Sequence, residues 1–135
     1  MRDINKIIVH CSATKEEQEF FADDIRRWHK ARGFSDIGYH FVINLDGVIE
    51  YGRDLKLTGA HCKGHNKGSI GICYIGGLDR NGEPMDTRTD EQVDSLTMLI
   101  CTLKRLHCNA EVHSHNDFSN KACPSFDATQ EYRWA

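Results

Sequence analysis

Two histidines and a cysteine, His10, His115 and Cys123, are the residues of this 135-residue chain best suited to chemistry. His10 ends a short β-branched run, and His115 and Cys123 lie eight residues apart in a polar segment. Imidazole and thiolate are ligands that zinc prefers, and three protein ligands leave the fourth tetrahedral position open, as catalytic zinc sites require. A catalytic zinc site is therefore one interpretation of these residue types.

The spacing of these residues leaves a second interpretation open. His115 and Cys123 match none of the short finger-type spacings, and His10 is distant in sequence. Solvent-exposed histidines and a buried free thiol would produce the same pattern. The choice between the two interpretations depends on the elements that hold the three residues.

Those elements follow from hydrophobic periodicity and from turn residues. Short apolar runs predict strands, and the Asp46-Gly47 pair predicts a hairpin turn. A capping box at Thr14–Glu17 predicts a helix that ends at Gly33, and another at Thr89–Gln92 opens a helix with an apolar face. The expected strands span 6–10, 40–44, 48–52, 69–75 and 110–113, the apolar helical face is Val93, Leu96, Leu99, Ile100, Leu103 and Leu106, and a last helix begins at Asp127.

This order, β-α-β-β-β-α-β-α, predicts an α/β fold with a central mixed β-sheet flanked by helices. The length and the absence of a linker indicate a single domain over residues 1–135. Glycines within 69–75 indicate close approach of other chain segments to that strand.

Composition excludes several classes of function. The net charge is −3 and Lys and Arg are scattered, which argues against a nucleic-acid partner. No apolar run approaches the roughly 20 residues that span a membrane, and no secretory signal is visible. We therefore expect a chain that is cytoplasmic as synthesised, with its six cysteines in the reduced state.

Five segments together resemble the type 2 N-acetylmuramoyl-L-alanine amidases, in particular the small phage lysozyme-type amidases, whose fold the peptidoglycan recognition proteins share. They occur in family order and cover nearly the whole chain, which makes the combination specific. The segments are 7–14 (IIVHCSAT), 37–43 (IGYHFVI), 59–66 (GAHCKGHN), 69–73 (SIGIC) and 121–127 (KACPSFD).

The resemblance implies roles for individual residues. His10, His115 and Cys123 are similar to the family's zinc ligands, and Tyr39 and Lys121 to residues that assist catalysis. Family members that only sense peptidoglycan have typically lost the thiolate, so Cys123 favours an enzyme. Some members use Asp as the third ligand, which keeps Asp117 as an alternative, and His113 would compete with His115 if its strand extended.

The chemistry of the two assisting residues is consistent with these roles. A lysine on the ligand loop can stabilise the oxyanion of a tetrahedral intermediate. The Tyr39 hydroxyl can orient water or substrate, but a phenol with a pKa near 10 is a poor general base at neutral pH, so proton transfer stays unassigned. His40, which follows Tyr39 on the strand, should point to the opposite face and be structural.

The implied activity is zinc-dependent hydrolysis of the amide bond between N-acetylmuramic acid and L-alanine in peptidoglycan or muropeptides. The phage-like register favours a bacteriolytic enzyme that reaches the wall through a membrane lesion. His61 and Asn66, in a polar loop, are candidates for contacting the substrate, although a solvated loop would look the same. The alternatives are a cytoplasmic muropeptide-recycling amidase, a non-catalytic peptidoglycan-binding module, and a cysteine hydrolase using Cys123 with His115 as base.

Overall fold

Five strands form the central sheet in the order β4-β3-β5-β1-β7. The computed structural model describes residues 2–135 of the chain. Strand β4 runs antiparallel to β3, and the other neighbours are parallel, so the sheet is mixed as the sequence predicts. The strands are β1 (Lys6–Cys11), β3 (Phe41–Ile43), β4 (Ile49–Tyr51), β5 (Ser69–Tyr74) and β7 (Glu111–Ser114).

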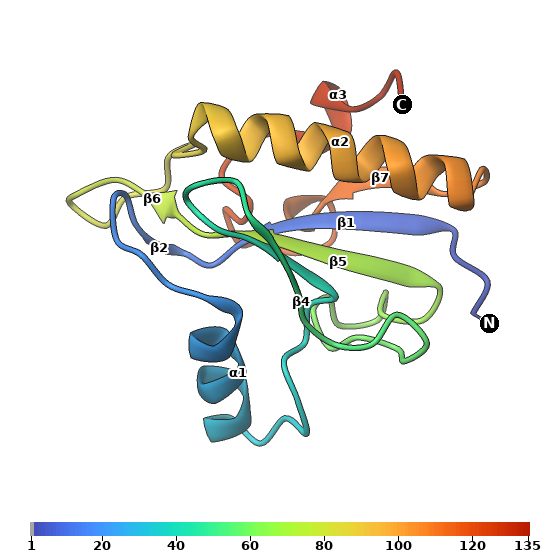
Figure 1. Cartoon of the computed structure of the whole chain (residues 1–135), viewed down its shortest axis with the longest axis horizontal. Coiled ribbons are helices and arrows are strands. Elements are labelled where there is room, and N and C mark those ends of the chain that lie inside the picture. The colour runs from blue at the N-terminus through green and yellow to red at the C-terminus, as the bar shows by residue number, and fades with distance from the viewer. Residues whose placement is uncertain (1) are drawn as a thin grey trace.

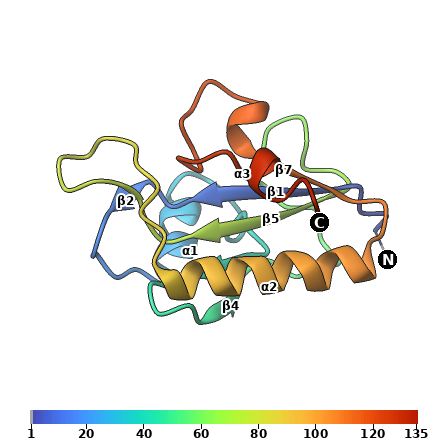
Figure 2. The same ribbon diagram turned by 90° about the horizontal axis from the view of Figure 1, so that it is seen from above.

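Helices cover both faces of this sheet. Figure 1 shows α2 (Asp90–Leu106) on one side and α1 (Ala22–Ala31) on the other, and Figure 2 shows α2 running along β5 and β1. The short helix α3 (Ala128–Glu131) begins at the predicted Asp127, whose side chain accepts a hydrogen bond from Gln130 N at 3.0 Å. Within residues 2–135, no helix is long and apolar enough to cross a membrane.

The alternation of β1 divides its side chains between the two faces. Ile7 and Val9 are buried in the cluster that contains Leu96 and Ile100 of α2. Because successive side chains of a strand point to opposite faces, His10 points toward the side that α1 covers. The apolar residues of β1 therefore anchor α2 while its last polar residue is presented to the opposite face.

The helix α2 begins where the sequence predicts. Thr89 and Gln92 form the capping box, with Gln92 N donating to Thr89 Oγ1 at 3.1 Å. The buried Gln92 amide also donates to the carbonyl oxygens of Ile43 and Ile75, so it ties the helix start to the sheet. Leu106 departs from the prediction, because it is the last helical residue and is 71% exposed.

The start of the first helix is the main correction to the sequence prediction. Thr14 and Lys15 form β2 (Thr14–Lys15), which pairs in parallel with β6 (Gly77–Leu78), a strand that the sequence analysis did not predict. Glu17 has a φ of +67°, which interrupts helical geometry. The helix α1 instead follows Phe21, whose backbone N–H donates to the Asp24 side chain at 2.8 Å. Pairing with a segment distant in sequence has overridden a local capping signal.

We expect Leu96→Ala to lower the free energy of unfolding by about 3 kcal/mol, because it leaves a cavity in the core under α2. The same truncation at Leu106 should change it by less than about 0.5 kcal/mol, since that side chain is exposed. Urea denaturation of both variants measures the difference. Equal losses would contradict this assignment of the buried face of α2.

Candidate metal-binding active site

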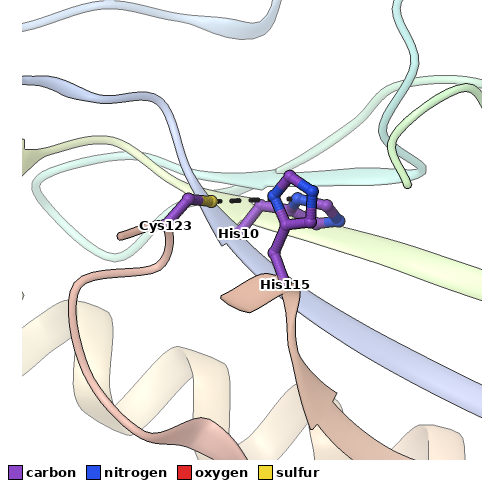
Figure 3. A group of neighbouring side chains, drawn as sticks. All are labelled: His10, His115 and Cys123. Carbon is purple, nitrogen blue, oxygen red and sulfur yellow. Dashed lines mark hydrogen bonds between the residues drawn. The ribbon is translucent and has the colours of Figure 1, made fainter. Parts of the chain in front are cut away.

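His10, His115 and Cys123 converge at one end of the sheet. Their ligand-capable atoms all lie within 4.8 Å of one another, and Cys123 Sγ is 3.9 Å from His10 Nδ1. The two imidazole rings have centroids 4.5 Å apart. Figure 3 shows both rings and the sulfur directed toward a common point. Within residues 2–135, no other group of three His, Cys, Asp or Glu side chains has this geometry.

Parallel pairing of β1 with β7 brings the two histidines together. Ile8 pairs with His113 and Val9 with Ser114, so the next positions along the two strands are His10 and His115. Residues directly opposite one another on neighbouring strands share a face of the sheet, and both strands end at the same edge. The register of this pair therefore determines that the two imidazoles meet.

Hydrogen bonds to the loop after Lys121 hold the cysteine in place. The Tyr74 hydroxyl donates to Pro124 O at 2.6 Å, and Ser125 Oγ donates to Gly77 O at 2.8 Å. The backbone N–H of Cys11 donates to Cys123 Sγ at 3.2 Å. The neighbouring Cys11 thiol and burial nevertheless raise the pKa of Cys123, so the thiolate form, which is the form that binds metals, depends on a positive charge beside the sulfur.

The donor atoms of this cluster fit a zinc ion. Among residues 2–135, the buried His115 Nδ1 has no hydrogen-bond partner, which is rare for a polar atom and which a bond to a metal ion would account for. Zinc bonds of about 2.0 Å to nitrogen and 2.3 Å to sulfur, at tetrahedral angles, require an N···S separation of about 3.5 Å. The observed 3.9 Å is close to that value.

The electrostatic surroundings keep both histidines neutral. Burial, together with the neighbouring imidazoles and Lys121, lowers the pKa of His10 well below its usual value. Burial and Lys121 also lower the pKa of His115. A neutral imidazole is the form that coordinates a metal, so the site is prepared for a cation and disfavours protonation.

The two competing ligands lie outside this cluster. Asp117 accepts hydrogen bonds from Ser114 N at 3.3 Å and from Thr129 Oγ1, so its carboxylate shapes the short turn that carries His115. His113 Nδ1 lies 3.4 Å from Asp117 Oδ2, and His113 Nε2 lies 3.5 Å from Glu111 Oε2. Among the three candidate residues of the segment 113–117, only His115 faces His10 and Cys123.

A cleft of about 600 Å³ adjoins the cluster, and Tyr39 and Lys121 line it. The Tyr39 ring lies 5.0 Å from the His10 ring, centroid to centroid. Burial and nearby cysteine thiols raise the pKa of Tyr39 well above its usual value, so its hydroxyl stays protonated and acts as a donor. The Lys121 side chain is exposed at the mouth of the cleft. Both residues therefore lie next to the group formed by His10, His115 and Cys123.

The cleft is cationic and lacks carboxylates. Arg32, Lys63 and Lys121 contribute its charges, and its lining within residues 2–135 includes no Asp or Glu. Such a cleft suits a ligand that carries carboxylates or amides. Arg32 was not predicted as a site residue from the sequence, where it only continues the helical spacing; in the structure it is the C-cap of α1.

His61 and Asn66 both line the cleft, but their polar atoms are largely used within the protein. Asn66 Oδ1 accepts from the backbone N–H groups of His61 and Cys62, at 2.8 and 2.9 Å. His61 is buried, and its Nδ1 lies 2.8 Å from His10 Nε2. This contact between His61 and His10 was not predicted from the sequence. The residue that could have indicated a close neighbour is Gly71, where a Cβ would lie only 2.6 Å from the His61 ring.

His40 lies just before β3 (Phe41–Ile43), and its ring is hydrogen-bonded within the protein, which fits a structural residue. Its Nδ1 accepts from Gly71 N at 3.1 Å, and its Nε2 lies 2.9 Å from Leu57 O. These bonds fasten the loop that carries His61 to the sheet. His29 of α1 has a similar role, because its Nδ1 accepts from Gly38 N at 2.9 Å, beside Tyr39.

Comparisons with known proteins lead to one family. The family model for N-acetylmuramoyl-L-alanine amidases matches residues 1–126. The endolysin of Escherichia phage T7 is 46% identical over 121 residues, which cover 90% of this chain and 80% of the relative. The endolysin of Klebsiella phage KP32 is 44% identical over 126 residues, which cover 93% of this chain and 83% of the relative.

Solved structures lead to the same family. The N-acetylmuramoyl-L-alanine amidase LysC from Clostridium intestinale URNW superposes with a TM-score of 0.82 at 30% identity, covering 97% of this chain and 83% of the other. Bumblebee PGRP-SA superposes with a TM-score of 0.81 at 26% identity, covering 98% and 82%. The chain belongs to the type 2 N-acetylmuramoyl-L-alanine amidase family and is an amidase that acts on peptidoglycan.

The buried His29 makes the stability of the fold depend on pH. Burial and the charges of Arg32 and Arg53 lower its pKa from 6.5 to about 4. Between these values the unfolded chain binds more protons than the folded chain, so the free energy of unfolding decreases as the pH falls from 6.5 to 4. We expect His29 to contribute up to roughly 3 kcal/mol of this loss.

Urea denaturation at pH 7 and pH 4, with a chelator present, tests this expectation. His29→Asn retains an acceptor for Gly38 N but removes the titrating ring, so it should show a smaller loss of stability than the wild type. The control His107→Asn, just after α2, should keep the wild-type pH dependence. If His29→Asn lost as much stability between pH 7 and pH 4 as the wild type, His29 would not be the source of this pH dependence.

Proposed function

We propose that this amidase is zinc-dependent, that residues 1–135 form its amidase domain, and that His10 Nδ1, His115 Nδ1 and Cys123 Sγ hold one zinc ion per chain. Two observations carry the proposal: the buried His115 Nδ1 has no hydrogen-bond partner among residues 2–135, and the ligand-capable atoms of the three residues lie within 4.8 Å of one another. When bound at such a site, zinc lowers the pKa of water and polarises an amide carbonyl.

The residues around this position have separate tasks in the proposed reaction. Lys121, at the mouth of the cleft, supplies positive charge where the oxyanion of the tetrahedral intermediate develops. Tyr39 stays protonated and donates a hydrogen bond that orients the scissile carbonyl. Its raised pKa excludes it as the general base at neutral pH, as the sequence analysis argued.

The substrate proposed for the cleft is the muramoyl peptide stem, attached to peptidoglycan or released as a muropeptide. Support comes from the cationic lining without carboxylates, which matches the acidic and amide groups of a peptide. Asn66 retains its Nδ2 donor for such a group, since only its Oδ1 is engaged within the described chain. His61 lines the same cleft, but both of its ring nitrogens face protein atoms.

The biological role that we propose is lytic. The relatives at 46% and 44% identity are phage endolysins. We propose that the chain is made in the cytoplasm and acts on the cell wall once a membrane lesion releases it. Muropeptide recycling in the cytoplasm is the alternative, with the same chemistry on a smaller substrate.

Removal of the proposed thiolate ligand tests zinc dependence. Purified wild-type protein should contain about one zinc per chain, and Cys123→Ser should retain the fold while losing most of its zinc and activity, because one of three ligands is weakened. Elemental analysis and wall digestion measure both quantities. The control Cys101→Ser, on α2, should behave like the wild type. Full activity in a metal-free preparation would refute the proposal.

Lys121→Ala tests the proposed oxyanion contact. We expect kcat to fall about 100-fold or more, with zinc content unchanged, since the lysine acts on charge that develops in the transition state. Steady-state kinetics on a soluble muramoyl peptide give both constants. Lys67→Ala, an exposed lysine of the preceding loop, serves as the matched control. A change in KM alone would make Lys121 a substrate-binding residue instead.

A further inference from the structure

A series of buried hydrogen bonds extends from His10, on the side of its ring away from His115 and Cys123. His10 Nε2 lies 2.8 Å from His61 Nδ1, and His61 Nε2 lies 3.2 Å from Ser69 Oγ. Ser69 Oγ in turn lies 3.0 Å from the carbonyl oxygen of Asn66. His10, His61 and Ser69 are all buried, so protein atoms and not bulk water determine where their protons lie.

The donor and acceptor in each of these hydrogen bonds are determined starting from the Asn66 end. The Asn66 carbonyl oxygen can only accept, so the single Ser69 hydroxyl proton is donated to it. Ser69 Oγ must then accept from His61 Nε2–H, which leaves His61 Nδ1 as an acceptor because a neutral imidazole carries one proton. His10 Nε2 therefore carries the proton in its bond to His61.

This assignment of donors and acceptors leaves His10 Nδ1 with a free lone pair. Nδ1 is the atom that lies 3.9 Å from Cys123 Sγ. The hydrogen bonds alone therefore assign the His10 proton to Nε2. A metal ion bound at this cluster requires the same tautomer. If the proton lay on Nδ1 instead, His10 would direct a donor at the position of the cation.

Two glycines make room for the His61 ring. A Cβ at Gly71 of β5 would lie 2.6 Å from His61 Cγ, and one at Gly59 would lie 2.7 Å from His61 Cδ2. Real Cβ atoms do not approach other atoms this closely, so both positions exclude a side chain while the ring is in place. The ring is clamped between two backbone segments and has little freedom to turn away from His10.

We infer that His61 and Ser69 are positioning residues, which fix the tautomer and ring orientation of His10 so that its Nδ1 is preset to bind the metal ion. This inference rests on the proposed zinc site. Neither residue touches the metal, and both act through His10. Outer hydrogen-bond partners of this kind typically contribute 10- to 100-fold to metal affinity.

The test compares zinc affinity in variants of the full chain, measured by competition with a chromophoric chelator. His61→Leu removes the acceptor for His10 Nε2–H, and we expect zinc to bind about 10- to 100-fold more weakly. His61→Asn places Oδ1 near the position of the lost Nδ1, so it should recover most of that affinity. Ser69→Ala should cause a smaller loss than His61→Leu. His65→Leu, in the same loop but outside this chain of bonds, should bind zinc like the wild type.

Two further measurements separate positioning from general damage to the fold. The melting temperatures of the metal-free variants show whether His61 contributes to stability only by packing. Absorption of the Co²⁺-substituted proteins reports ligation: the ligand-field bands should shift in His61→Leu and return in His61→Asn, with the thiolate band from Cys123 present in all.

The outcomes distinguish this inference from the zinc proposal. Wild-type zinc affinity in His61→Leu would overturn the positioning role. Equal losses of affinity and of melting temperature in His61→Leu and His61→Asn would also overturn it, since they would make the ring a packing element. A wild-type protein that binds no zinc would instead overturn the zinc proposal, and the positioning role with it.

Discussion

The parallel pairing of β1 with β7 is the constraint on which the site depends. Two strands separated by about a hundred residues of sequence must lie side by side in one register for His10 and His115 to meet. A slip of one residue would send one imidazole to the opposite face, into the core beneath α2. The apolar residues Ile7, Val9 and Val112 resist such a slip because each is buried against that core. Packing on one face of the sheet thereby determines the ligand geometry on the other.

The same arrangement buries polar groups at a cost to the fold. Imidazoles and a thiol removed from water lose hydrogen bonds that must be replaced. His10 and His40 replace theirs with protein partners, whereas His115 Nδ1 has none. The protein thus places its unsatisfied nitrogen where a cation would compensate it, which is a frequent trade between stability and activity at functional sites.

The cleft beside this cluster separates recognition from chemistry. Its charges come from Arg32, Lys63 and Lys121, which belong to three different segments of the chain. His115 and Tyr39 also line it, and burial keeps the His115 imidazole neutral and the Tyr39 hydroxyl protonated. The positive charges of the cleft are therefore exposed, whereas the neutral His115 and Tyr39 lie next to His10 and Cys123. This division suits hydrolysis of an amide within a larger anionic polymer.

The sequence by itself determined the fold class, the hairpin at Asp46-Gly47 and the start of α2, because local periodicity and turn chemistry specify those features. The candidate ligands came from the chemistry of their side chains and from the resemblance to a family. Only the tertiary structure decided that Thr14 pairs with Gly77 instead of capping a helix. It likewise decided that Asp117 accepts a hydrogen bond within its own turn instead of facing His10 and Cys123. It also decided that His61 lies against His10. These outcomes depend on contacts between segments far apart in sequence, whose energies outweigh local preferences of about 1 kcal/mol and leave no periodic signal in the chain.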